Sequence, residues 1–130
     1  MSFFTRWICI IAAIWLLAGC GAVRAPRPGV INHVVIFKLK NADSAKELLL
    51  DCDNHLAKIP GVASYYAGEH FDIGNRNVDS DYDVVFYAGF KTQRALEDFI
   101  NHPLHIRIKS KWEPRLQWMR VLDTIHRERR

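Results

Sequence analysis

Cysteine is scarce in this chain of 130 residues, which contains only Cys9, Cys20 and Cys52. Cys9 lies in a predicted signal segment and Cys20 at its end, so only Cys52 remains in the predicted domain. The sequence therefore excludes an intrachain disulfide framework there. Because Cys52 follows the apolar spacing of a predicted helix, we expect a buried, unreactive thiol.

Motifs of several enzyme classes are also absent. The sequence has no glycine-rich phosphate loop, no nucleophile elbow and no paired-carboxylate motif. Cys52 and His55 are three residues apart, as are His102 and His105, but neither couple has the further ligands nearby that a closed zinc site requires. We therefore expect no metal and no cofactor.

The main apolar run is Trp7 to Leu17, eleven residues that follow Arg6. A membrane-spanning helix needs about 20 apolar residues, so this run is typical of a signal peptide. It ends in Leu17-Ala18-Gly19-Cys20, which resembles a bacterial lipobox. The resemblance implies cleavage after residue 19 and a lipid such as palmitate at Cys20. An uncleaved N-terminal anchor helix is the alternative.

The predicted location is the cell envelope, with the chain held at the membrane by its N-terminal lipid. In lipoproteins that this sequence resembles, an aspartate after the lipidated cysteine favours the inner membrane. Gly21 stands there, so we expect the outer membrane where a cell has one. Residues 20–29 include Arg24, Pro26 and Pro28 and show no apolar period, which predicts an extended tether.

The net charge of +4 is unevenly distributed. Residues 41–83 carry nine acidic side chains, whereas residues 101–130 carry eight Lys and Arg. Nucleic-acid binding would require basic residues interleaved with aromatic ones, in a compartment that holds nucleic acid. We therefore expect no nucleic-acid partner, and residues 126–130 are predicted to form a solvated basic tail.

Hydrophobic periodicity predicts one domain over residues 30–125. The expected elements are a strand Asn32–Lys40, a helix from Ser44 to Pro60-Gly61, strands Val62–Phe71 and Tyr82–Phe90 around a polar loop Gly74–Asp81, a helix from Thr92 to Ile100, a helical segment Leu104–Trp112 and a strand Leu116–Ile125. This order is the split βαβ arrangement of an α+β, ferredoxin-like domain, with a four-stranded antiparallel sheet and both helices on one face.

Three local signals accompany these elements. Ser44 and Glu47 have the spacing of a capping box, and Thr92 is a favourable N-cap. Lys109 and Glu113 are four residues apart on a predicted helix, which predicts an ion pair.

The strands have apolar side chains on both faces, although two helices can cover only one. In the first strand, Val34 and Ile36 alternate with Phe37 and Leu39. A monomer would leave an apolar patch of several hundred Å² in water, so we expect a homodimer that packs sheet to sheet.

Several segments together resemble the stress-responsive A/B barrel (Dabb) family, within the dimeric α+β barrel group. They are His33-Val34-Val35-Ile36-Phe37-Lys38, Ile59-Pro60-Gly61-Val62, Gly68 after Tyr65-Tyr66, Tyr82-Asp83-Val84-Val85, Phe90, His102-Pro103-Leu104-His105 and Val121-Leu122-Asp123. A plant polyketide cyclase of similar sequence uses a histidine that matches His105 as general base. Its first-strand histidine matches His33, and its tyrosine matches Phe99, which has no hydroxyl.

Three functions follow as hypotheses. The first is a binding module whose apolar cavity holds a small hydrophobic or aromatic compound, and its expected lining is Val35, Phe37, Phe86, Phe99, Met119 and Val121. The second is a cyclase or lyase in which His105 is the base and His33 orients a carbonyl. The third is a structural stress protein. For the histidines the alternatives are backbone capping by His102 or His105 and a core position for His33, and Phe99 on its helix stripe fits a core residue.

Overall fold

The computed structural model describes residues 29–127. The predicted signal peptide, the predicted lipidation site Cys20 and nearly all of the predicted tether lie outside the described residues. Within the described part, none of the helices has the length and apolar character needed to span a membrane.

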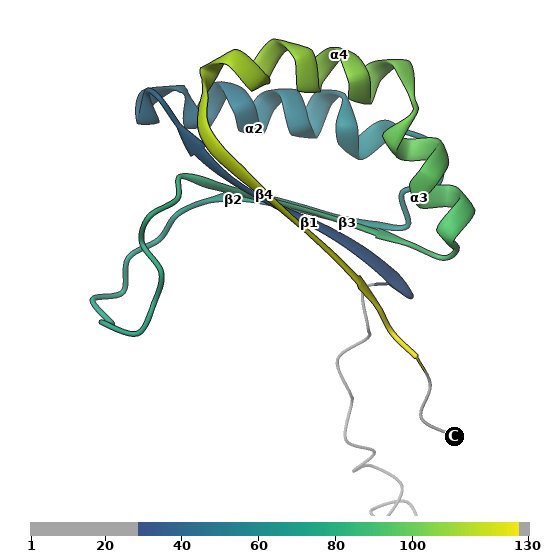
Figure 1. Cartoon of the computed structure of the whole chain (residues 1–130), viewed down its shortest axis with the longest axis horizontal. Helices are drawn as coiled ribbons and strands as arrows, with labels where there is room; N and C mark the ends of the chain where they lie inside the picture. Colours follow the sequence, from purple (N-terminus) through teal and green to yellow (C-terminus); the bar gives the residue numbers. More distant parts are fainter. Residues whose placement is uncertain (1–28, 128–130) are drawn as a thin grey trace, which may run out of the picture.

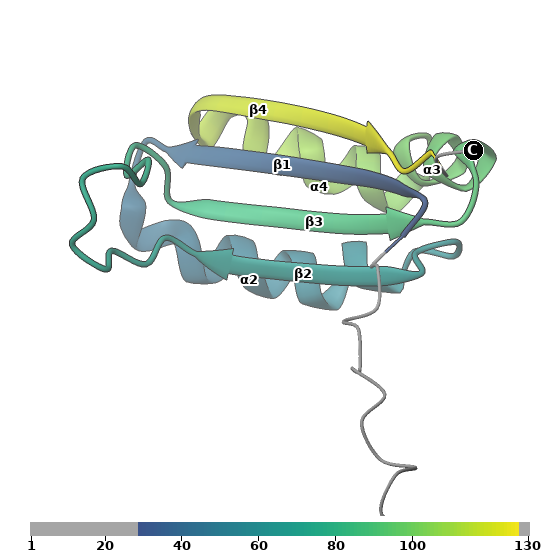
Figure 2. The ribbon, with the colours of Figure 1, turned by 90° about the horizontal axis from the view of Figure 1, so that it is seen from below.

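Four strands form one antiparallel sheet in the order β2-β3-β1-β4. Its strands are β1 (Ile31–Leu39), β2 (Ser64–Glu69), β3 (Val84–Phe90) and β4 (Leu116–Ile125). The helices α2 (Ala45–Asn54), α3 (Gln93–Ile100) and α4 (Pro103–Trp112) all lie on one face of this sheet (Figure 1). Figure 2 shows the four strands side by side with the helices behind them. The ferredoxin-like α+β fold is confirmed.

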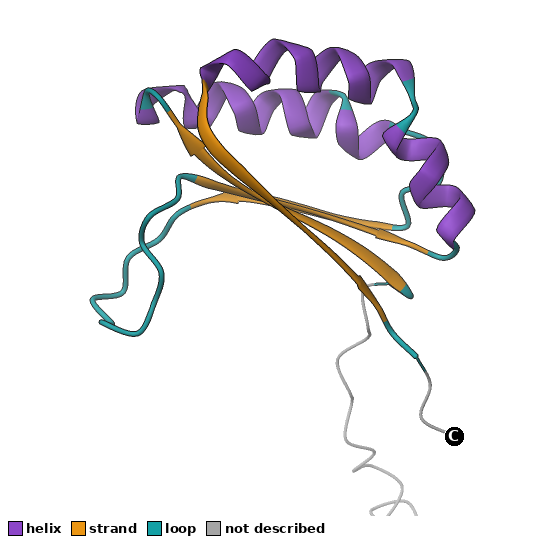
Figure 3. Ribbon diagram, in the orientation of Figure 1, coloured by secondary structure: helices purple, strands orange, loops and turns teal. Residues whose placement is uncertain are grey.

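The core lies between the sheet and the helices (Figure 3). Every second residue of β1, from Ile31 to Leu39, is buried, because a strand turns alternate side chains to opposite faces. The largest fully buried side chains come from strands and helices alike, and they are Trp112, Phe86, Phe90, Phe99, Leu48, Val84 and Cys52. All of them lie within the predicted domain.

The first helix differs from the sequence prediction at both ends. A short 3-10 turn, η1 (Ala42–Ser44), runs directly into α2, so Ser44 is itself helical, with φ −79° and ψ −3°, and its side chain caps nothing. Asn41 is the N-cap instead, and its side chain accepts from the Asp43 N–H at 3.1 Å. The capping-box prediction was wrong, because an N-cap side chain needs extended backbone to reach back. The helix also ends at Asn54, followed by a 3-10 turn, η2 (Leu56–Lys58).

The second helical region follows its local signals. The Thr92 side chain accepts from the Ala95 N–H at 3.1 Å, which confirms the predicted N-cap. The chain breaks at Asn101 and begins α4 at Pro103, where the His102 Nδ1 accepts from the Leu104 N–H at 3.2 Å. One of the predicted capping roles for histidine is therefore present. After α4 a 3-10 turn, η3 (Glu113–Arg115), leads into β4.

The connection between β2 and β3 spans residues 70–83 and is longer than the predicted loop. Side chains of Asp72, Asn75 and Asp79 each accept from the N–H two residues later. Such turns compete with strand pairing for the backbone, so β2 ends earlier and β3 begins later than the sequence predicts.

Candidate functional site

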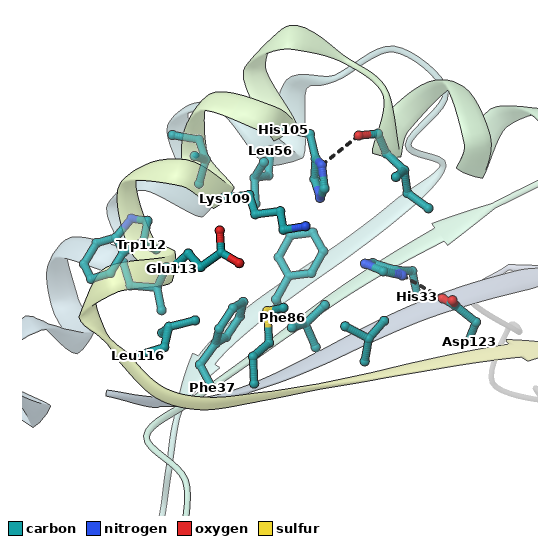
Figure 4. A pocket seen from close by; sticks show the side chains of 16 residues that line it. His33, Phe37, Leu56, Phe86, His105, Lys109, Trp112, Glu113, Leu116 and Asp123 are labelled. Carbon is teal, nitrogen blue, oxygen red and sulfur yellow. Dashed lines mark hydrogen bonds and ion pairs between the residues drawn. The ribbon is translucent and has the colours of Figure 1, made fainter. Parts of the chain in front are cut away.

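A cavity of about 250 Å³ lies between α4 and the sheet (Figure 4). Strands β1, β3 and β4 form its floor, α4 its roof, and Leu48 of α2 with Leu56 of η2 complete the wall. Met119 and Val121 line it and are nevertheless 39% and 45% exposed. The cavity therefore opens to solvent along the β4 edge.

The structure places five of the six expected apolar lining residues in this wall. Cross-strand register brings them together: Val35 of β1 lies opposite both Phe86 and Val121, and Phe37 lies opposite Met119. Because paired residues on adjacent strands point to the same face, the helix-facing side chains of three strands meet here.

Phe99 lies behind the wall and not in it. It is fully buried, with a relative exposure of 0%, and does not line the cavity. Its ring centroid lies 6.2 Å from that of Phe86, 5.2 Å from Phe90 and 4.9 Å from His105. Its contacts are those of a core residue that supports two cavity residues.

His33 of β1 is 6% exposed and holds one edge of its ring toward Asp123. The two atoms His33 Nδ1 and Asp123 Oδ1 are 2.6 Å apart. A carboxylate accepts, so Nδ1 carries the hydrogen and the neutral ring keeps its lone pair on Nε2. Figure 4 shows this second nitrogen directed into the cavity.

His105 of α4 is held in a similar way from the opposite side. Its Nδ1 lies 2.9 Å from the Ile100 carbonyl oxygen, which can only accept, so Nε2 again has the free lone pair. Burial lowers the pKa of His105; the backbone hydrogen bond raises it, and His33 and Lys109 lower it further. A neutral imidazole at pH 7 follows. A backbone contact of His105 is the alternative that the sequence offers to a catalytic role. In the structure His105 makes this contact and also lines the cavity.

Three charged side chains also line the cavity: Lys109, Glu113 and Asp123. The predicted ion pair between Lys109 and Glu113 is not formed among the described residues. Figure 4 shows the ammonium and the carboxylate directed at the cavity instead. The cavity therefore combines an apolar wall with imidazole, ammonium and carboxylate groups.

Trp112 anchors the other end of the cavity. It is 2% exposed and lines the wall, while its indole N–H donates to Asp51 Oδ2 at 2.7 Å. Arg115 lies over the same ring, 3.9 Å from its centroid, and pairs with Glu47. Hydrogen bonds from Arg115 and Lys111 lower the pKa of Glu47 to about 2. These contacts join α2, α4 and η3 at this end.

Within residues 29–127 no group of three His, Cys, Asp or Glu side chains has the geometry to hold a metal ion.

The chain matches the model of a known protein family over most of its length. This family is described as "Stress responsive A/B Barrel Domain", and its model matches residues 31–126, nearly the whole of the described domain. This chain belongs to that family. The resemblance noted in the sequence is therefore confirmed for this A/B barrel domain.

Solved structures share the fold of this A/B barrel domain. A Dabb family protein from Mesorhizobium loti with a ferredoxin-like fold is 25% identical, with a TM-score of 0.63 over 75% of this chain and 97% of its own. A dimeric ferredoxin-like protein of unknown function from Thermobifida fusca is 19% identical, with a TM-score of 0.62 over 74% and 90%. A hydroxynitrile lyase from Passiflora edulis is 17% identical, with a TM-score of 0.66 over 79% and 98%.

The Mesorhizobium protein was crystallised as a chain hardly longer than this A/B barrel domain, because the match covers 97% of it. Residues 21–130 of the present chain contain every described element.

The sequence reasoning did not select Asp123, Lys109, Glu113 or Trp112 as site residues. A signal for Asp123 was available, since the last strand of a ferredoxin-like sheet pairs antiparallel with the first, and an acid there can face the first-strand histidine. Lys109 and Glu113 follow His105 at steps of four, which places all three on one face of α4.

Proposed function

We propose that the cavity binds one small apolar compound of one or two rings. The observation that carries this proposal is the continuous apolar wall, built from three strands and α4, around about 250 Å³. An engineered apolar cavity of about 150 Å³ in another protein stays dry and admits benzene, so this volume accommodates a somewhat larger ligand. Binding would remove Val121 and Met119, both partly exposed, from water.

The polar groups would orient such a compound. His33 and His105 each present Nε2 to the cavity while their Nδ1 atoms are held by Asp123 and Ile100. Neutral imidazoles in this arrangement accept a hydrogen bond from a hydroxyl, and a protonated ring donates one to a carbonyl. Ligand sites typically combine an apolar wall with a few such fixed groups.

A cavity-filling variant tests binding. Native mass spectrometry of residues 21–130, together with melting curves against a panel of aromatic compounds, should identify ligands that raise Tm. Val121→Trp should abolish the rise, since the indole fills the cavity mouth. Val78→Trp is the matched control, because Val78 is 40% exposed in the loop between β2 and β3 and does not line the cavity. No carried compound and no Tm shift with any panel member would contradict the proposal.

A second candidate is a cyclase or lyase, and the His33–Asp123 contact favours it. In this reading the His105 Nε2 removes a proton from a carbon next to a carbonyl, and His33, when its ring is protonated, donates its Nε2–H to the carbonyl oxygen. The similarity in fold to a hydroxynitrile lyase is compatible with such chemistry. Phe99 stands where the resembling plant cyclase has a tyrosine, so that enzyme's own reaction is not the one proposed.

Substitution of His105 distinguishes the binding function from the enzymatic function. Wild-type protein is screened for turnover of small hydroxynitriles and of polyketide thioesters. His105→Ala should retain binding and lose turnover of any substrate found, whereas His102→Ala keeps turnover because His102 does not line the cavity. Normal turnover by His105→Ala would remove the proposed base. Failure of both binding and turnover would favour the structural stress protein.

We also propose that a second copy covers the open face of the sheet. Val34, Ile36 and Val85 lie there between Tyr66 and Leu122, which are 60% and 49% exposed. No helix of the described part lies on this face (Figure 1). The Thermobifida fusca protein of the same fold is described as dimeric. Light scattering should give a dimer that Leu122→Glu converts to a monomer, and a monomeric wild type would contradict this.

Finally, we propose that the chain is a lipoprotein of the cell envelope. Leu17-Ala18-Gly19-Cys20 after an eleven-residue apolar run supports this, as does the tether that follows. The full chain expressed in a bacterium should incorporate labelled palmitate and fractionate with membranes. Cys20→Ser should lose the label. A labelled Cys20→Ser protein, or an unlabelled wild type in the soluble fraction, would contradict the anchor.

A further inference from the structure

Lys109 places a cation at the solvent-exposed side of a largely apolar cavity. It lies on α4, and Figure 4 shows its side chain crossing the cavity with the ammonium directed between the walls. It forms no ion pair within the described part of the chain. Other lysines and arginines nearby are differently placed: Lys111 and Arg115 pair with Glu47.

The charges facing Lys109 are arranged in a row along α4. His105 precedes it by four residues and Glu113 follows it by four, so each is about 6 Å away along the helix axis. On the floor, His33 presents its Nε2, and Asp123 is already held by His33 at 2.6 Å. Figure 4 draws Glu113 beside Trp112, on the opposite side of Lys109 from His33.

At the histidine end of the cavity Lys109 supplies the cation, while the Asp123 carboxylate is hydrogen-bonded to His33 and Glu113 lies on the opposite side of Lys109 (Figure 4). Three nitrogen-bearing groups line this end: the imidazoles of His33 and His105 and the ammonium of Lys109. The pKa of His105 is consistent with this, because besides burial the proximity of His33 and Lys109 lowers it. An apolar compound with a neutral polar group would leave the ammonium without a counter-ion.

We infer that the cavity ligand is a small organic anion, an aromatic or aliphatic carboxylate whose oxygens bind Lys109 and whose apolar body lies on the strand side chains. This inference rests on the proposed binding function and specifies its ligand class. Lys109 becomes the residue that selects anions over neutral compounds of the same shape.

A pair of probes with the same shape tests this selection. Titration calorimetry at pH 8 compares 2-naphthoate with 2-naphthamide on residues 21–130. We expect naphthoate to bind about tenfold more tightly, since a charge-assisted hydrogen bond in a partly solvated site contributes roughly that factor. Added salt should weaken naphthoate binding and leave naphthamide unchanged.

Variants of α4 assign the preference to one side chain. Lys109→Met keeps the aliphatic stem and should lose about tenfold for naphthoate with little change for naphthamide. Lys109→Arg should restore most of the preference. Arg107→Met is the matched control, because Arg107 is an exposed cation on the same helix that does not line the cavity; it should change neither affinity.

The results separate the two proposals. Equal affinity for both probes, or a Lys109→Met variant that weakens both alike, overturns the anion inference and leaves the binding function standing. Binding of neither probe, together with no ligand from the wider panel, overturns both. A preference for naphthoate that survives in Lys109→Met also overturns the role of Lys109.

Discussion

Cys52 should make the folded domain lose stability at alkaline pH. Its side chain is completely buried on α2, with a relative exposure of 0%. Burial raises the pKa of its thiol from the ordinary 9.0 to about 12, and the neighbouring Asp53 and Asp51 add to the rise. The thiol therefore stays protonated in the folded chain at a pH where it ionises in the unfolded chain.

The size of the effect follows from this difference in pKa. A group whose pKa is raised by folding favours the folded state fully below its unfolded value, and this contribution is lost as pH rises toward the folded value. For Cys52 the window runs from 9.0 to about 12. At pH 10 the loss amounts to about 1.4 kcal/mol, since each pH unit above the unfolded pKa is worth about 1.36 kcal/mol.

Urea unfolding of the wild type and of Cys52→Ala measures this loss of stability at alkaline pH. Residues 21–130 contain no other cysteine, so the difference between the two proteins reports on the replacement of this one thiol. At pH 8 the wild type should be the more stable, because alanine leaves a cavity. By pH 10 this advantage should shrink by about 1.4 kcal/mol. An advantage that is unchanged between the two pH values would show that the thiol is solvated, and would refute the burial argument.

Three further predictions concern stability. Trp112→Phe removes the indole donor of Asp51 and should cost about 1 kcal/mol in urea unfolding, because Asp51 retains a lysine donor. Gly61→Ala should cost about 1–2 kcal/mol in the same assay, since Gly61 has φ +95°. Glu47 has a pKa lowered to about 2, chiefly by Arg115, so its stabilisation is present above its ordinary 4.5 and is lost as pH falls toward 2. The Tm difference between wild type and Glu47→Gln should therefore be present at pH 6 and vanish near pH 2, and a constant difference would contradict the pairing.

Hydrophobic periodicity in the sequence predicts most of the helices and strands of the fold. The alternation of β1 predicts its type, and Thr92 predicts the start of α3. The predicted boundaries of helices were wrong where a side chain had two possible partners. Glu47 has the capping-box position, but Arg115, distant in sequence, takes its carboxylate at 2.6 Å. Long-range pairs of this kind cannot be found from spacing along the chain.

The apolar residues that line the cavity could be predicted from the sequence, whereas the charged residues that line it could not. Period two groups Val35 and Phe37 on one face of their strand, and cross-strand register adds Phe86, Met119 and Val121 to that face. The contact between His33 and Asp123 needs that register as well. Phe99 shows what helical periodicity cannot predict. An apolar stripe on a helix identifies a buried residue, but it does not tell whether that residue lines a cavity or packs behind the residues that line it.

Lys109 and Glu113 illustrate why helical spacing alone was insufficient. Such pairs contribute only about 0.2–0.5 kcal/mol, and a lysine that precedes its glutamate, as here, is the weaker orientation. The packing of α4 on the sheet involves much larger energies, since Trp112 and Ile108 are both buried beneath it. Packing therefore sets the rotation of α4, and this rotation turns both charges toward the cavity. A neutral imidazole, a cation and an anion thus follow one another along its roof, which would orient a bound carboxylate toward the histidine end.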